Sequence, residues 1–232
     1  MDRHDLAASI RSAWTFLEAS GLAESFAVAD PLPVDPGFRD LILSPDSGHQ
    51  EIYSYALRNS FYNFLLFDHA FFQFSWKAEN DFRFAYYPNP HVSKPDALYK
   101  FRKYRQMVLD EKIDEEEFAN LVQKMRFDGG VPVFRYEYSE NQYDELRHPC
   151  SHLHIGIHGE NRWAVSRVLT PLAFVKLMVK HYYPAEWAQG VSEVGRVDVH
   201  HFEEALIDEK NRCQEVGDEH FSSAERRSFH FG

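Results

Sequence analysis

Apolar side chains recur along this chain with two different periods, and each period marks a kind of element. Near the N-terminus they recur every three or four residues. This spacing predicts an amphipathic helix over Arg3–Ala19, with a buried face of Leu6, Ile10, Ala13, Trp14 and Leu17. Four prolines between residues 29 and 48 predict a long irregular connection after it.

Further helices are predicted where the three- and four-residue spacing returns, over residues 50–60, 94–125, 170–183 and 199–213. The second of these is expected to break near Lys112, because Asp114 and Glu117 form a capping arrangement for a new helix. Thr170 before Pro171 is typical of a helix start.

The period changes to two between residues 61 and 87, which predicts three consecutive strands of a meander over 61–68, 70–77 and 81–87. Phe72, Phe74 and Trp76 then share one face of the sheet. A fourth strand is predicted over residues 131–139 and a fifth from Ser151 onward.

The fifth predicted strand carries an unusual row of histidines. Leu153, Ile155 and Ile157 point to one face, whereas His152, His154 and His158 point to the other with a glycine gap between them. If the fourth and fifth strands pair as a hairpin with their apolar faces together, Arg135 and Glu137 lie beside His152 and His154. The sequence therefore predicts a polar site on this face of the sheet.

These elements predict an α+β fold, with a mainly antiparallel sheet of about five strands and helices packed on one face. The chain has 232 residues, of which 44% are hydrophobic and 16% aromatic, and this is typical of a globular protein with a sizeable core. We expect a single domain over residues 1–232, with residues 217–232 as a possible extended tail because they show no clear period.

Charge and cysteine content narrow the class of protein. The net charge of −11 argues against a general nucleic-acid coat, although the cluster Lys100, Arg102, Lys103 and Arg105 leaves local phosphate contact open. The two cysteines, Cys150 and Cys213, provide no disulfide framework, so a cytoplasmic location is expected. No apolar run approaches the roughly 20 residues of a membrane span, so we expect no membrane partner.

Several segments together resemble a bacterial family of conserved proteins of unknown function. The shared features are His148-Pro149, the segment His152-Leu153-His154-Ile155-Gly156, and the runs 62–74, 83–90, 135–137 and 171–174. The resemblance covers about the middle two-thirds of the chain and implies a bacterial cytosolic protein. It implies no reaction, and association with antiviral defence or toxin-type gene clusters is an expectation by analogy.

The site residues are compatible with two kinds of chemistry. In a metal-independent phosphodiesterase or ribonuclease, His152, His154 and His148 would exchange protons, and Arg135 or Arg147 would stabilise charge on the phosphate. Arg102 and Lys103 are further candidates for phosphate binding, and Glu137 completes the catalytic candidates.

Alternatively, His152 and His154 hold a divalent metal such as zinc, iron or manganese, since His-x-His on a strand presents two nitrogens to one ion. The set could be completed by Glu137, Glu160, His148 or His158. A nucleophilic Cys150 is a weaker option. The function that we expect is that of a subunit of a larger assembly, in which the histidine face meets a protein partner or a second copy of the chain.

Overall fold

A single antiparallel sheet forms the centre of the molecule. The computed structural model describes residues 1–92, 95–125, 132–157, 161–192 and 201–229. In this part of the chain the sheet has seven strands, which lie side by side in sequence order. They are β1 (Ala23–Phe26), β2 (Phe64–Leu66), β3 (Phe71–Ala78), β4 (Asp81–Tyr87), β5 (Phe134–Ser139), β6 (Ser151–Ile155) and β7 (Trp163–Ala164).

The α+β class and the antiparallel sheet are confirmed, but the predicted number of about five strands is wrong. The two additional strands, β1 and β7, form the edges of the sheet. They have only four and two residues. A strand this short, with one neighbour and largely exposed side chains, leaves no alternation in the sequence.

Helices pack against both faces of the sheet. They are α1 (Arg3–Ala19), α2 (Pro36–Leu43), α3 (His49–Arg58), α4 (Pro95–Leu109), α5 (Glu115–Gln123), α6 (Pro171–Tyr182), α7 (Pro184–Ser192), α8 (His201–Arg212) and α9 (Ser223–Phe229). The predicted break between α4 and α5 is confirmed, with the Asp114 side chain accepting a hydrogen bond from the Glu117 amide at 2.7 Å.

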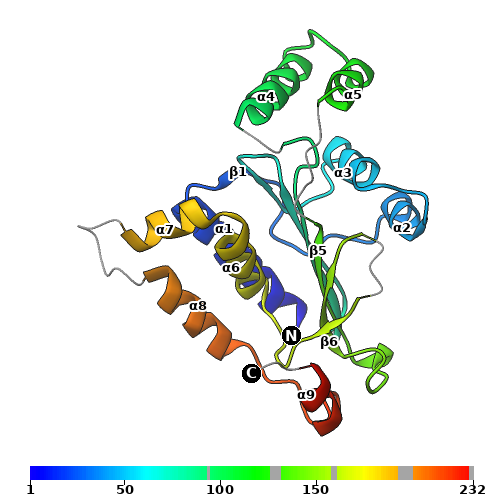
Figure 1. Cartoon of the computed structure of the whole chain (residues 1–232), viewed down its shortest axis with the longest axis vertical. Helices are drawn as coiled ribbons and strands as arrows, with labels where there is room; N and C mark the ends of the chain where they lie inside the picture. The colour runs from blue at the N-terminus through cyan, green and yellow to red at the C-terminus, as the bar shows by residue number, and fades with distance from the viewer. Residues whose placement is uncertain (93–94, 126–131, 158–160, 193–200, 230–232) are drawn as a thin grey trace.

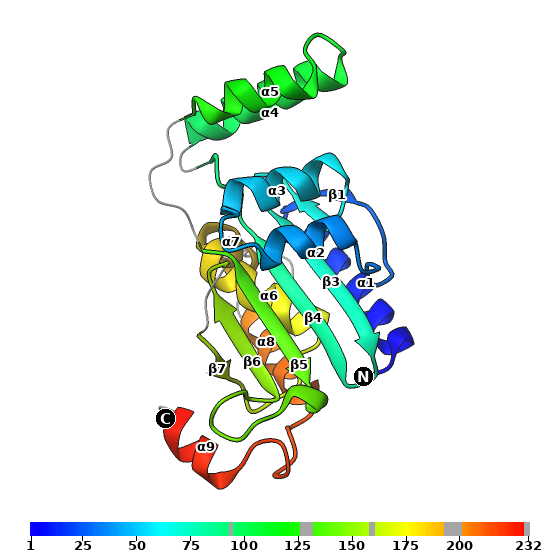
Figure 2. The same ribbon diagram turned by 90° about the vertical axis from the view of Figure 1, so that its right-hand side faces the viewer.

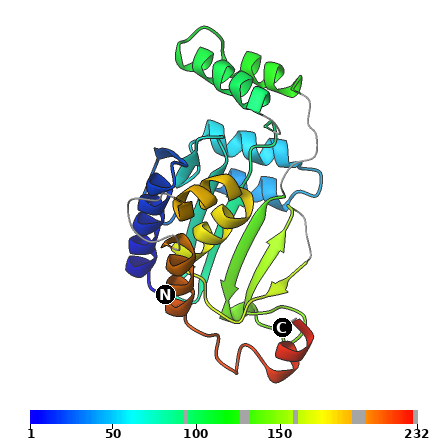
Figure 3. The same ribbon diagram turned by 60° about the vertical axis from the view of Figure 1, so that its left-hand side comes forward.

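The first face of the sheet is covered by α1 and α6, with α7 and α8 beside them (Figure 1, Figure 3). Every second residue of β3, β4 and β5 points to this side, and these side chains are almost all aromatic. Phe72, Phe74, Phe84 and Tyr136 are fully buried there against Phe174 and its neighbours on α6. This is the main hydrophobic core.

The second face is also covered, so the prediction that helices pack on one face only is wrong. The hairpin of α2 and α3 lies over β3 and β4, and α4 and α5 lie beyond α3 (Figure 2). Phe38 and Tyr53 from these helices pack with Phe71 and Tyr87 of the sheet. The sequence pattern predicted α3, α4 and α5 but missed α2, because this helix has only eight residues and lies within the segment predicted as an irregular connection.

The two helical layers differ in extent. Helices α2 and α3 cover the part of the second face around Phe71 and Tyr87 (Figure 2). The remaining, polar half of this face lies outside their hydrophobic contacts. On that half lie the alternate residues of β5 and β6, and these form the site described below. None of the helices in the described ranges has the length and apolar character needed to cross a bilayer.

The C-terminal segment 217–229 folds back onto the loop between β5 and β6. The Glu225 carboxylate is fully buried. It accepts hydrogen bonds from the Tyr143 hydroxyl at 2.9 Å and from the Ser222 amide at 2.8 Å. Ser222 in turn accepts from the Glu225 amide, so the two residues form a capping box at the start of α9. The segment that showed no clear period thus contains a docked helix.

Candidate metal centre

Two cross-strand rows of side chains form the polar half of the second face. In the first row Arg83 of β4 lies opposite Glu137 of β5, which lies opposite His152 of β6. In the second row Arg135 lies opposite His154. The expectation that Arg135 and Glu137 lie beside the two histidines is therefore confirmed. It follows from the pairing of two strands whose apolar residues share the core.

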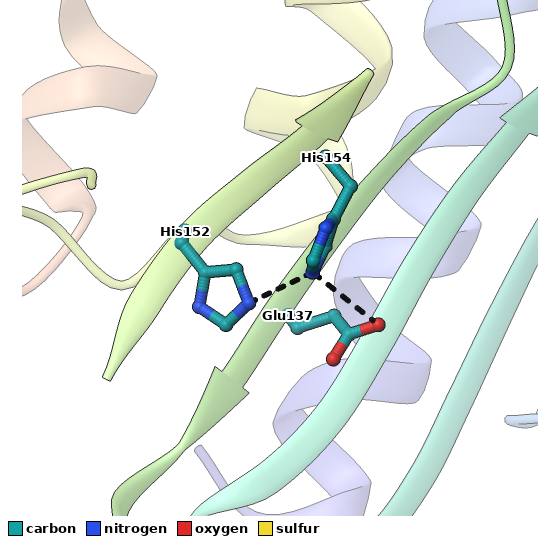
Figure 4. A group of neighbouring side chains, drawn as sticks. All are labelled: Glu137, His152 and His154. Carbon is teal, nitrogen blue, oxygen red and sulfur yellow. Dashed lines mark hydrogen bonds and ion pairs between the residues drawn. The ribbon is translucent and has the colours of Figure 1, made fainter. Parts of the chain in front are cut away.

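The rings of His152 and His154 are hydrogen-bonded to each other (Figure 4). The Nδ1 atom of His152 lies 2.7 Å from the Pro149 carbonyl oxygen, and its Nε2 atom lies 2.9 Å from Nε2 of His154. Because a carbonyl can only accept, His152 carries its proton on Nδ1 when neutral. Its Nε2 atom then accepts the hydrogen bond that His154 donates.

The third member of this group is Glu137. Its Oε1 atom lies 3.9 Å from Nε2 of His154 (Figure 4). Its Oε2 atom lies 3.5 Å from the guanidinium of Arg83. Burial alone would raise the pKa of Glu137, but Arg83, His154 and Arg135 outweigh it and lower the pKa below its usual value. The carboxylate is therefore ionised at neutral pH.

All three side chains are buried. The exposed fractions are 0% for His152, 5% for His154 and 8% for Glu137. Burial lowers the pKa of His152 to about 4, with the neighbouring His154 acting in the same direction. His152 is thus neutral at physiological pH, the form in which imidazole binds metals.

The donor atoms of Glu137, His152 and His154 all lie within 4.8 Å of one another. Two nitrogens bound about 2.1 Å from one ion are about 3.0 Å apart at a right angle and about 3.4 Å apart in a tetrahedron. The observed 2.9 Å between the two Nε2 atoms matches the first of these separations. The Glu137 Oε1 atom lies 3.9 Å from Nε2 of His154, so an approach of roughly 0.5–0.9 Å would bring it to the separation expected of a third ligand.

His148 lies close to this group but outside it. Its ring is perpendicular to that of His152, with 4.9 Å between the ring centroids. Burial and Arg162 lower the pKa of His148. Its Nδ1 atom is buried and makes no hydrogen bond to the residues that the structure describes. His148 therefore covers His152, and the closest three-ligand group is formed without it.

A pocket of about 230 Å³ adjoins the group on the side of α2. Its polar lining includes Arg83, Arg135 and Glu137, so the Glu137 carboxylate is shared between the pocket and the histidine pair. Its apolar wall is formed by residues of α2, of β4 and of the segment between α3 and β2, namely Phe38, Ile42, Leu43, Phe61, Ala85 and Tyr87.

The other predicted site residues lie elsewhere. Arg147 is exposed and pairs loosely with Asp144 at 3.9 Å. Arg102 on α4 binds Glu24 of β1 at 2.7 Å, at the sheet edge opposite to the histidines, and Lys103 is exposed on the same helix. The structure does not bring these three cations to the polar site, and phosphate binding by them stays a prediction.

Cys150 lies on the other face of the sheet, in the main core, where burial raises its pKa to about 12. A thiol with this pKa is protonated at neutral pH and does not act as a nucleophile. His158 and Glu160, two of the predicted additional ligands, lie outside the described residues.

Sequence reasoning gave no role to Arg83 or to the residues of α2 that wall the pocket. Arg83 alternates with Phe82 and Phe84, so its face could be predicted, but its position opposite Glu137 depends on the pairing of β4 with β5 across a long connection. For α2 a local signal did exist. Asp35 followed by Pro36 is a helix start, and the Asp35 side chain accepts from the Phe38 amide.

No curated protein and no solved structure matches this chain. A family match exists, and it extends over residues 38–232, which include α2 from Phe38 onward, the polar rows, the histidine pair and α9. Within this range lie all the residues of the candidate metal centre and of its apolar wall, whereas four other residues of the pocket lining, Leu32 to Asp35, precede it. The chain belongs to the family of uncharacterized conserved proteins designated DUF2290.

Proposed function

We propose that this protein is a metal-dependent hydrolase in which Glu137, His152 and His154 hold one divalent transition-metal ion. The observation that carries the proposal is the preassembled donor set, two imidazole nitrogens 2.9 Å apart beside an ionised carboxylate. Two histidines and one carboxylate are a common ligand set for zinc and iron, and they leave coordination positions open.

The surroundings support hydrolysis. A divalent ion supplies Lewis-acid activation of water when bound at such a site. Arg83 and Arg135 line the adjoining pocket and present positive charge on the side from which a ligand would reach Glu137. Cations in this position stabilise the negative charge that develops on the substrate during hydrolysis.

Metal-independent acid–base chemistry has less support from the same geometry. A general base must reach the proton that it removes. His152 has no exposed surface, and both of its nitrogens are engaged with Pro149 and His154. Its pKa of about 4 is also far below the neutral range in which a histidine base works best. These features suit a ligand better than a proton carrier.

The test is the metal content of protein purified without a histidine tag, measured by elemental analysis. We expect close to one zinc, iron or manganese ion per chain, and none in the variant His152→Gln/His154→Gln. Glutamine keeps polar groups in the buried site, so the double variant is expected to fold. Circular dichroism and thermal melting of the metal-free protein check this. His4→Gln, which changes an exposed histidine at the N-terminus, is the matched control.

Two results would contradict the proposal. One is wild-type protein that remains metal-free after incubation with each of the three ions. The other is a metal content that the double variant retains. If metal is bound as expected, hydrolysis of model phosphate and carboxylate esters by the loaded protein is compared between the wild type and the double variant.

A second candidate role, as a subunit of a larger assembly or a homo-oligomer, is favoured by a separate observation. Trp163 lies on β7, the last strand in the sheet order, and its side chain is 62% exposed. Exposed tryptophan is enriched where proteins meet partners. Light scattering of the purified chain would report self-association. If the purified chain is a monomer, and if Trp163→Ser changes neither its mass nor the proteins that co-purify with it, this candidate is removed.

A further inference from the structure

The pocket beside the candidate metal centre has two chemically different sides. One side is apolar and is built from α2 and the sheet, with Phe38 and Tyr87 in ring contact at 6.1 Å between centroids. Val34 and Leu43 continue this side to the rim, where both are largely exposed. The other side is polar and carries Arg83 and Arg135.

The two arginines have donors to spare. The contact between Arg83 and Glu137 is long, at 3.5 Å, and the Arg83 side chain is 57% exposed. The Nε atom of Arg135 is buried and donates to no acceptor in the described part of the chain. A buried donor without an acceptor is unfavourable, so this guanidinium is arranged for a group that comes from outside the chain.

The charged side chains of the pocket favour an anion beside the two arginines once a metal ion is bound. Asp35 accepts from the Phe38 amide and the Tyr55 hydroxyl, and Arg39 pairs with Asp40. The remaining charges of the lining are those of Arg83 and Arg135 against Asp35 and Glu137, and they balance. A divalent ion held by the Glu137 group would therefore leave the pocket positive, in a chain whose net charge is −11.

We propose that this pocket binds a small phosphate ester, with the phosphate held by Arg83 and Arg135 and the organic part against Phe38, Ile42 and Tyr87. The inference rests on the proposed function in one respect, because the phosphate would lie beside the ion held by Glu137, His152 and His154. Guanidinium groups bind phosphate through paired hydrogen bonds. A tetrahedral phosphate offers oxygens to two guanidiniums and an ion at once, whereas a planar carboxylate is satisfied by one guanidinium.

The size of the pocket limits the ligand. Its volume of about 230 Å³ is below the roughly 300–1,000 Å³ of most ligand pockets. It therefore accommodates a small ester or one end of a larger molecule. The aromatic wall favours a flat organic group, since such groups pack well against phenylalanine and tyrosine rings.

The experiment measures binding of phenyl phosphate by calorimetry to the full chain, both metal-free and loaded with zinc. Inorganic phosphate, benzoate and phenol are the comparison probes, which separate the phosphate, the carboxylate and the aromatic ring. We expect phenyl phosphate to bind best in both states. Arg83→Gln and Arg135→Gln should each weaken it about tenfold, as expected for loss of charge-assisted hydrogen bonds. Arg11→Gln, at an exposed position of α1, should leave binding within about twofold, because surface charges far from the ligand are screened.

The outcomes separate the two proposals. Protein that holds one metal ion but binds phenyl phosphate no better than phenol overturns the phosphate pocket and leaves the metal site standing. Arginine-dependent binding in a chain that takes up no metal overturns the metal site and supports the pocket. The phosphate assignment is also overturned if benzoate binds as tightly as phenyl phosphate, or if the Arg83→Gln/Arg135→Gln double variant binds phenyl phosphate as tightly as the wild type.

Discussion

The Nε2 atoms of His152 and His154 lie 2.9 Å apart and share one proton. With Nδ1 of His152 bound to the Pro149 carbonyl, that proton belongs to His154 when both rings are neutral. An ion that binds both nitrogens must displace it, so His154 changes tautomer on metal binding. The hydrogen bond of the metal-free pair and the proposed metal site are therefore two states of one arrangement.

Removing the carboxylate while keeping its shape tests whether Glu137 is a ligand. We expect Glu137→Gln to weaken metal binding by more than the ~10–100-fold loss that is typical of residues outside the ligand set. Stability should change by less than about 1 kcal/mol, because the lost ion pair is to the largely exposed Arg83. Competition with a fluorescent zinc chelator measures the affinity.

The matched control for Glu137→Gln is Glu145→Gln, which removes an exposed carboxylate from the neighbouring loop. The two variants change the net charge equally, so an electrostatic effect of the whole chain would weaken metal binding in both. Equal zinc affinity for Glu137→Gln and wild type would show that the carboxylate is not a ligand.

Four histidines predict the acid stability of the protein. Burial lowers the pKa of His49, His69, His91 and His152 to about 4 from the usual value of 6.5. Between these values the unfolded chain takes up protons that the folded chain does not, so folding stability falls as the pH drops from about 6.5 to about 4. Below about 4 both states are protonated and the loss levels off. Thermal melts of metal-free protein across this range should show the decline.

A variant isolates the contribution of one of these histidines. His91→Gln removes a titrating group from the interior, so its melting temperature should fall less than that of the wild type between pH 6.5 and pH 4. Over this pH range the free energy of unfolding of the variant should fall by less than that of the wild type, with a difference of the order of 1–3 kcal/mol. Parallel pH profiles for the variant and the wild type would contradict burial of a neutral His91.

The sequence predicted most of what local patterns determine. The bounds of α1 and β4 are those predicted, and the strand faces are correct because the side-chain period of two leaves one choice once a core is required. For the same reason the meeting of Glu137 with His152 was predictable from the two alternating runs. These features depend on neighbours in the sequence or on a single hairpin.

The features that were missed depend on contacts between distant segments. β1 is a strand because Ala23–Phe26 pairs with Phe64–Leu66, which follows it by some forty residues. The covering of the second face by α2 depends on Phe38 meeting Tyr87. The pocket and the part that Arg83 plays in it follow from this covering, and no local pattern encodes them.

Asp68 provides a test of a buried carboxylate outside the site. It lies in the turn between β2 and β3 and accepts hydrogen bonds from the Tyr183 hydroxyl at 2.9 Å and the Ala70 amide at 3.0 Å. Burial outweighs these bonds and raises the pKa of Asp68. An acid whose pKa is raised on folding stabilises the folded state at low pH, and this contribution is lost as the pH rises through the folded pKa.

The variant Asp68→Asn removes this charge and keeps an acceptor for the Ala70 amide. We expect its melting temperature, relative to that of the wild type, to be higher at pH 8 than at pH 4, because only the wild type bears the cost of a buried charge at pH 8. Asp46→Asn, at an exposed position, should show no such difference. The opposite trend for Asp68→Asn would mean that the Tyr183 bond holds the carboxylate in its charged form.

Phe84 tests the aromatic core that holds the sheet beneath the site. Its ring is fully buried and lies 5.4 Å from the rings of Phe74 and Tyr136 and 6.0 Å from that of Phe174. Truncation to alanine leaves a cavity at the centre of this packing, for which a loss of about 3–5 kcal/mol is expected. Phe26→Ala is the control, because Phe26 is 40% exposed on the edge strand β1, and a loss of about 1 kcal/mol is expected there. Urea denaturation measures both variants, and similar losses would contradict the view that α6 and the strands share one close-packed core.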